Sequence, residues 1–212
     1  MKKRLFFHLI FTFSCCFFLF FCAAQPANYK VLDANSRSSI VKKIETASSQ
    51  MNSLQVAFTQ EKSSGMFLEK VVSKGKMYYK KSSMLKWAYS QPTNYAIIIN
   101  PRGAFFKTGN KVTKNKMISE LGNLLLHTIN GQLLTNNNDF SITYYKKDDI
   151  LAILKPQNKR LKELYSSIEV YLHPQTYIAN KVILKEKNGD ITEIKFSNPQ
   201  KNITIADAEF QE

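Results

Sequence analysis

Cysteine is confined to one end of this chain of 212 residues, since Cys15, Cys16 and Cys22 are its three cysteines. Beyond Cys22 the sequence therefore excludes a disulfide, a thiolate nucleophile and a cysteine metal site. A chain of this length can bury a hydrophobic core without covalent cross-links. We expect one domain that is stabilised by packing alone.

Recognisable catalytic patterns are also missing. The only histidines beyond the first 24 residues are His127 and His173, and no His-x-x-x-His, Gly-x-Ser-x-Gly or paired acidic motif occurs. Gly103 and Gly109 do not form a phosphate-binding loop. We therefore expect a binding protein without a metal or cofactor. The alternative is a secreted enzyme of unrecognised mechanism, which an activity lost on replacing His127 or His173 would support.

The first 24 residues have the layout of a secretory signal peptide. Three basic residues, Lys2 to Arg4, precede an apolar run from Leu5 to Phe21, and small residues follow up to Ala24. This pattern predicts export and cleavage after Ala24. The apolar run is close to the lower limit for a membrane span, so an uncleaved anchor is the alternative.

Acidic residues are scarce. The chain has 16 aspartates and glutamates and 30 lysines and arginines, which gives a net charge of +14. Loss of Lys2, Lys3 and Arg4 would lower this to +11. Export disfavours nucleic acid as a partner, and the basic residues are spread along the chain. We expect a solvated lysine-rich surface, with attraction to anionic lipid headgroups or an acidic partner as the alternative.

The stretch from Val71 to Ile99 organises the rest of the chain. Its residues alternate between apolar and polar over Val71–Lys80 and again over Met84–Tyr89, which predicts strands with one apolar face. A turn at Pro92 precedes Tyr95–Ile99, which is apolar on both faces and should be covered on both sides.

The remaining patterns predict an α+β fold with about eleven antiparallel strands and an apolar concave side. We expect a linker over residues 25–35 and one domain over 36–212. The domain begins with a helix capped by Ser36 or Ser38. Met117–Ile129 predicts a second, strongly apolar helix, and a short final strand is expected around Ile203–Ile205. Two helices cannot easily fill such a sheet, so the surplus apolar surface suits an acyl chain or another lipid.

Three motifs follow one another in the strand region: Phe58-Thr59-Gln60, then Ser73–Lys81 (SKGKMYYKK), then Leu85–Tyr89 (LKWAY) with Gln91-Pro92. Their order and spacing resemble the outer-membrane lipoprotein carrier (LolA) family over roughly Ser36 to Phe210. The resemblance implies an open antiparallel β half-barrel with helices as a lid over its apolar concave face.

The resemblance to this family also implies that the protein is a periplasmic chaperone. Such a chaperone is expected to be a monomer and to need no cofactor. Such a protein accepts lipoprotein acyl chains from an inner-membrane ABC transporter and hands them to an outer-membrane acceptor. The alternative on the same fold is a carrier or sensor of another amphiphile, such as a glycolipid or polyene-type lipid.

The resemblance also implies roles for individual residues, if the aromatic strand face points inward. The candidates for the lipid-binding cavity are Leu54, Val56, Phe58, Met77, Tyr79, Leu85, Trp87, Tyr89, Ile97 and Ile99. The candidates for the lid are Met117, Leu121, Leu124 and Leu125.

Lys81 is the candidate for the latch that controls lid closure and release. Well-known family members carry a basic residue followed by Arg-Pro where this chain has Lys80, Lys81 and Ser82. Lysine keeps the positive charge but lacks the planar, multi-donor fork of arginine. We therefore expect a looser latch.

Overall fold

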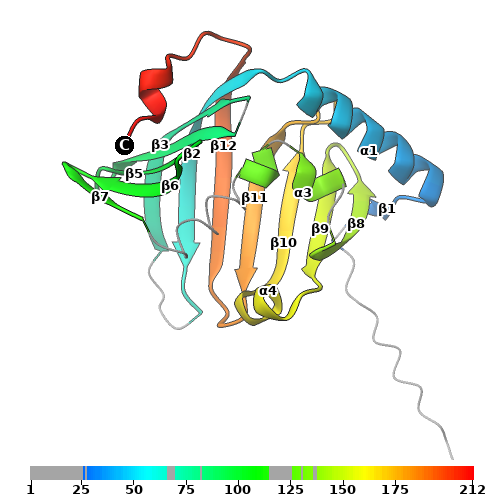
Figure 1. Ribbon diagram of the computed structural model, residues 1–212. Helices are drawn as coiled ribbons and strands as arrows, with labels where there is room; N and C mark the ends of the chain where they lie inside the picture. Colours follow the sequence, from blue (N-terminus) through cyan, green and yellow to red (C-terminus); the bar gives the residue numbers. More distant parts are fainter. Residues whose placement is uncertain are drawn as a thin grey trace, which may run out of the picture.

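The computed structural model describes residues 26, 28–65, 70–81, 83–114, 126–129, 131–135 and 138–212. These residues form a twelve-stranded sheet in the order β1-β8-β9-β10-β11-β12-β2-β3-β4-β5-β6-β7, in which neighbouring strands are antiparallel (Figure 1). The strands are β1 (Lys30–Val31), β2 (Ser53–Ser63), β3 (Lys70–Lys80), β4 (Met84–Gln91), β5 (Tyr95–Asn100), β6 (Gly103–Thr108), β7 (Lys111–Thr113), β8 (Phe140–Lys146), β9 (Ile150–Pro156), β10 (Tyr165–Leu172), β11 (Ala179–Glu186) and β12 (Ile191–Lys201). The expected open antiparallel architecture is confirmed.

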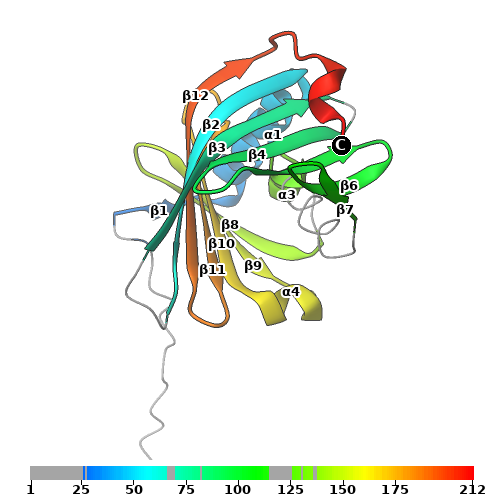
Figure 2. The ribbon, with the colours of Figure 1, turned by 90° about the vertical axis from the view of Figure 1, so that its left-hand side faces the viewer.

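Besides residues 126–129, which are helical as well, helices accompany the sheet in the described part of the chain. They are α1 (Ala34–Ser49), α3 (Gln132–Thr135), α4 (Lys159–Leu164) and the 3-10 helix η1 (Asp207–Phe210). Figure 2 shows α1 and α3 on the hollow side of the curved sheet. None of the described helices is long and apolar enough to cross a membrane.

The N-terminal boundary differs from the expectation in two ways. Helix α1 begins at Ala34, because the Asp33 carboxylate accepts a hydrogen bond from the Ser36 amide at 2.9 Å and so caps the helix. Ser36 is thus inside the helix and does not cap it. The expected linker also contains structure, since Lys30 and Val31 pair with β8.

Strand β5 is covered on both faces, as its apolar sequence predicts. Ile97 and Ile99 belong to the inner core, while Ile98 on the opposite face is only 1% exposed. The outer cover is the C-terminal segment, because η1 lies against β4 and β5 and Phe210 is buried. Residues 203–205 lead into this segment, so the expected strand there is wrong.

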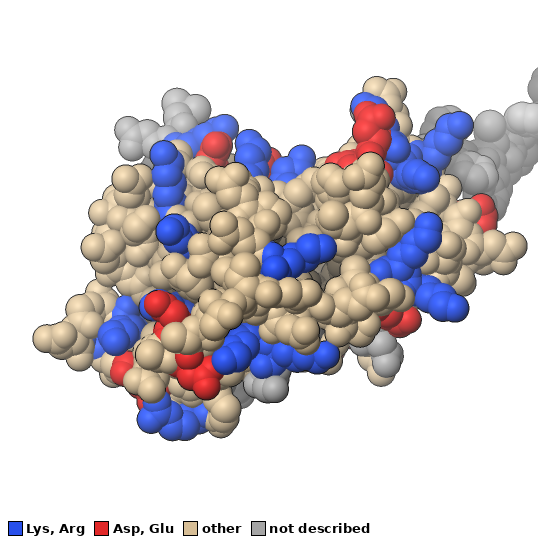
Figure 3. All heavy atoms as spheres, turned by 90° about the horizontal axis from the view of Figure 1, so that it is seen from above, with Lys and Arg blue, Asp and Glu red and all other residues tan. Residues whose placement is uncertain are grey.

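Ion pairs hold the C-terminal segment to the sheet. Lys86 Nζ lies 2.9 Å from Glu209 Oε2, and Arg102 Nη2 lies 2.7 Å from Glu212 Oε2. Elsewhere the basic side chains are dispersed, and on the face seen from above they lie in separate patches among uncharged residues (Figure 3). The net positive charge is therefore spread over this face.

The inner core consists of two clusters. One is built on β2 to β6 and contains Met51, which follows α1. The other is built on β8 to β11, against which α1 buries Ile40 and Ile44 and α3 buries Leu133 and Leu134. Helix α1 thus packs against the cluster on β8 to β11 and leads at Met51 into the cluster on β2 to β6. The space between the clusters is the place for a site.

Candidate functional site

A cavity of about 70 Å³ lies between the two core clusters. Its wall combines residues of α1 and α3 with inner-face residues of β2, β3, β4, β10, β11 and β12. Ser48, Thr128 and Tyr177 bring hydroxyl groups, and no charged side chain lies among the described residues that line it. The surroundings therefore suit an apolar ligand.

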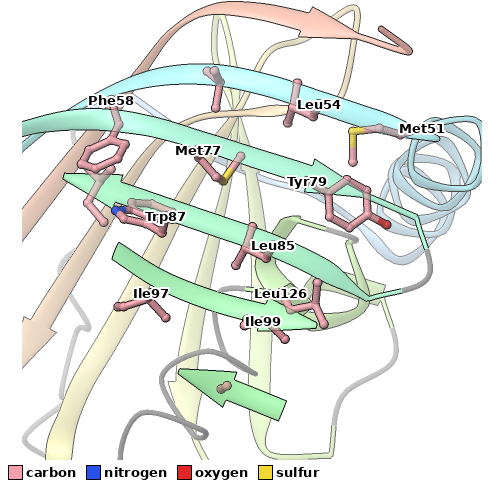
Figure 4. Packing of buried hydrophobic residues seen from close by; sticks show 13 residues of the cluster. Met51, Leu54, Phe58, Met77, Tyr79, Leu85, Trp87, Ile97, Ile99 and Leu126 are labelled. Atoms are coloured by element: carbon pink, nitrogen blue, oxygen red, sulfur yellow. The ribbon is translucent and has the colours of Figure 1, made fainter. Parts of the chain in front are cut away.

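The register of the strands aligns the expected cavity residues in rows. Val56 of β2 lies opposite Met77 of β3, which lies opposite Trp87 of β4. Leu54, Tyr79 and Leu85 form the parallel row. Figure 4 shows the side chains of Leu54, Met77, Tyr79, Leu85 and Trp87 projecting from the same face of the sheet.

Only part of this face borders the cavity. Leu54, Val56, Met77 and Trp87 line it. The other candidates lie in or against the same hydrophobic cluster but outside the cavity wall: Phe58, Tyr79, Leu85, Tyr89, Ile97 and Ile99. They pack beside the wall residues in this cluster, and a direct contact of any of the ten residues with a lipid stays a prediction.

Aromatic rings close one side of the cavity. Trp87 is 4.6 Å from Phe58 and 5.9 Å from Phe196, measured between ring centroids. Both partners hold the Trp87 ring in place, and Phe196 itself lines the cavity. No hydrogen-bond partner of the buried Trp87 Nε1 occurs among the described residues, so the ring serves as an apolar wall.

The opposite wall was not among the expected site residues. It comes from the C-terminal half of the chain: Ile168, Leu172, Tyr177, Ile178, Ala179, Val182, Leu184, Ile194 and Phe196. β12 pairs with β2 and places Phe196 opposite Phe58, which brings these strands to the site. The alternation of Ile168, Val170 and Leu172 was the available signal, but it gives no partner strand.

The lid candidates Met117, Leu121, Leu124 and Leu125 lie outside the described residues, so their role stays a prediction. Residues 126–129 at the end of the expected helix are helical. Leu126 is buried in the cluster on β2 to β6, and Ile129 lines the cavity. This short piece therefore covers the cavity together with α1 and α3.

Two contacts join the covering segments. Gly131, with φ +75°, lies so close to α1 that a Cβ atom there would stand 2.3 Å from Ser48 Oγ and 3.3 Å from Ile44 Cγ2. On the other side, the Lys81 ammonium donates to the Ser49 carbonyl at 3.0 Å and the Lys81 amide donates to the Asn52 carbonyl at 2.8 Å. Lys81 thus ties the β3–β4 turn to the end of α1.

Replacing Gly131 by alanine should loosen the cover of the cavity. The left-handed conformation costs a residue with a Cβ roughly 1–2 kcal/mol, and the new methyl group would push against Ser48 and Ile44. We expect a loss of about 2 kcal/mol in the free energy of unfolding and faster entry of a fluorescent fatty acid. Urea unfolding and stopped-flow binding measure the two effects.

Adding Ser48→Ala to Gly131→Ala provides the control. It removes the hydroxyl oxygen from the contact and leaves the backbone conformation unchanged, so it should restore part of the stability and slow the entry again. An entry rate unchanged in both variants would show that this contact does not limit access.

The comparisons with known proteins agree with this geometry. The family model for the outer membrane lipoprotein carrier protein LolA matches residues 49–212. The chain belongs to the LolA family. No curated protein sequence matches it.

Several solved structures resemble the chain at low sequence identity. MucB is 12% identical with a TM-score of 0.50, over 84% of this chain and 63% of MucB. A LolA superfamily protein from Nitrosomonas europaea is 11% identical with a TM-score of 0.45, over 83% of this chain and 97% of that one. The Mycobacterium tuberculosis lipoprotein LppX is 11% identical with a TM-score of 0.48, over 82% of this chain and 99% of LppX.

Proposed function

We propose that this LolA family member is a periplasmic carrier that binds the acyl chains of lipoproteins in the cavity between its two core clusters. It acts by binding, without covalent chemistry. The apolar cavity, closed by α1, α3 and residues 126–129, carries the proposal. Donor and acceptor are an inner-membrane ABC transporter and an outer-membrane acceptor, as in the family role that the sequence motifs indicate.

The cavity must expand when it binds a chain. Roughly 10–15 Å³ of such space holds one water molecule, so about 70 Å³ accommodates only a few groups of that size. Entry of a whole acyl chain therefore requires α1 and α3 to move away from the sheet. The buried Ile44 and Leu134 both line the cavity, and this movement would expose them.

The ligand can offset this cost through its own burial. Each buried methylene group contributes about 0.8 kcal/mol, so ten of them contribute about 8 kcal/mol before the opening cost is subtracted. An affinity of this kind needs no hydrogen bond to the chain. A protein that binds in this way can hold a lipid during transfer and still release it.

The direct experiment is to purify the protein from the periplasm of its own organism and to identify bound lipid by mass spectrometry. Lipoprotein acyl groups at about one lipidated polypeptide per protein are the expected result. A glycolipid or polyene lipid in their place would overturn the lipoprotein assignment. Failure to bind any lipid, together with no uptake of a fluorescent fatty acid, would overturn the carrier role itself.

Lys81 should act as the latch of the closed form. Replacing it by methionine removes the bond to the Ser49 carbonyl, so a bound fluorescent fatty acid should dissociate about twofold to fivefold faster, as for one modest hydrogen bond. Lys81→Arg should slow dissociation, because guanidinium has more donors to share among carbonyls. Stopped-flow displacement measures both rates.

Lys76→Met is the matched control. Lys76 lies on β3, the strand that leads to Lys81, with its side chain exposed, and it does not line the cavity. The substitution Lys76→Met removes the same charge as Lys81→Met and should leave the dissociation rate of the fatty acid unchanged. Equal rates for Lys76→Met and Lys81→Met would contradict the latch.

A further inference from the structure

A second hollow of about 370 Å³ adjoins the apolar cavity and is open to solvent. The end of α1, the β3–β4 turn and α3 form its wall. Ser48 and Gly131 line both spaces. A molecule with its chains in the cavity would therefore place its head in this hollow once Ser48 and Gly131 separate.

The hollow is polar where the cavity is apolar. Hydroxyl groups come from Ser48, Ser49 and Ser83, and the charged side chains among its described lining residues are Lys81 and Glu45. These two charges are opposite, so the hollow does not favour a strongly anionic group. Donor groups without an excess of charge suit neutral oxygen acceptors.

Tyr79 brings a further donor to this hollow. Its side chain lies on the inner face of β3, is only 5% exposed and lines the hollow. No hydrogen bond of its hydroxyl occurs among the described residues, and burial raises the pKa of this hydroxyl. The hydroxyls of two other tyrosines bond to described residues: Tyr89 donates to Gln60 Oε1 at 2.8 Å, and Tyr144 donates to the Leu134 carbonyl.

Tyr79 places a hydroxyl in an otherwise apolar row, between Leu54 and Leu85. Phenylalanine would fill the same position without a polar atom. Because Tyr79 lines the solvent-open hollow, its hydroxyl can donate to an acceptor that a ligand brings there.

We propose that the polar hollow binds the ester carbonyls of a diacylglyceryl group, with the Tyr79 hydroxyl and the Lys81 ammonium as donors. This inference rests on the proposed function, because the acyl chains attached to those esters occupy the apolar cavity. Lys81 has three N–H donors, so it can keep its bond to Ser49 and still donate to a carbonyl. The protein then recognises the linkage at the top of the chains as well as the chains.

The test compares two ligands that differ only in the carbonyls: dioctanoylglycerol and the dioctyl ether of glycerol. Both displace a fluorescent fatty acid, which gives their affinities. The unmodified protein should prefer the ester about threefold to tenfold, the range expected for a hydrogen bond. In Tyr79→Phe the ester should lose most of this preference, and the affinity for the ether should stay unchanged.

Tyr78→Phe is the matched control, because Tyr78 precedes Tyr79 on the opposite face of β3 and lines neither hollow. It should keep the preference for the ester. Thermal unfolding provides a second readout: Tyr79→Phe should be at least as stable as the unmodified protein, since no hydrogen bond to a described residue is lost.

Each outcome decides between the two proposals. Equal affinity for ester and ether in the unmodified protein, or a preference that survives Tyr79→Phe, would overturn the assignment of the hollow and leave the acyl-chain site intact. Binding of neither ligand nor the fluorescent fatty acid would overturn the carrier proposal and this inference with it.

Discussion

Replacing Gly75 by alanine is expected to lower the free energy of unfolding by about 3 kcal/mol or more. A Cβ atom at this position would stand 2.0 Å from the Ala88 carbonyl oxygen of β4 and 2.6 Å from Phe58 Cζ. The first of these atoms is backbone, so β3 and β4 would have to separate. At about 2–4 °C per kcal/mol for a domain of this size, the midpoint of thermal unfolding should fall by roughly 6–12 °C.

The absent side chain has a structural use. Gly75 pairs with Phe58 on one side and with Tyr89 on the other. The rings of Phe58 and Tyr89 meet edge to face, with centroids 5.1 Å apart. A glycine between them lets aromatic residues from β2 and β4 touch across β3, and this contact supports Trp87 at the cavity wall.

Gly109→Ala gives the comparison for Gly75→Ala. Gly109 has φ +54°, and a Cβ atom there would have no atom of a described, non-adjacent residue within 4 Å. Its replacement should therefore cost only the roughly 1–2 kcal/mol of an unfavourable backbone conformation. If Gly75→Ala proves no less stable than the unmodified protein, the two strands are not as close as the structure has them.

The strands from β2 to β5 are predictable from the sequence, because each pairs with the next one along the chain. Alternation places Met77 and Tyr79 on one face, and the turn at Pro92 separates two hairpin strands. The same local reasoning predicts that β5 is covered on both sides. It does not identify η1 as the outer cover, because the contact between Phe210 and β5 joins segments that are distant in the sequence.

For the same reason, the sequence predicts only one of the two walls of the candidate site. Leu54, Val56, Met77 and Trp87 come from consecutive strands, whereas the facing wall depends on the pairing of β12 with β2. Alternation in β10 and β11 indicates strands but does not say which sheet edge they join. The cap at Asp33 was missed because Asp and Ser are similarly good caps, and only the contact with the Ser36 amide distinguishes them.

Filling the cavity from that facing wall should abolish most of the affinity for acyl chains. Ala179 of β11 lines the cavity on the sheet side, so a larger residue there stays in place when α1 and α3 move. Leucine adds three carbon atoms and displaces about three methylene groups of the ligand. At about 0.8 kcal/mol each, the loss is about 2.4 kcal/mol, or roughly fiftyfold in the dissociation constant of a fluorescent fatty acid.

The fold should tolerate Ala179→Leu, because the added carbon atoms enter an existing space and do not displace packed side chains. Ala57→Leu is the matched control: Ala57 lies opposite Lys76 in β3 and does not line the cavity. It adds the same group to the sheet and should leave the affinity unchanged. Unchanged affinity in Ala179→Leu, with thermal unfolding showing an intact fold, would place the acyl chain elsewhere and would refute the cavity as the lipid site.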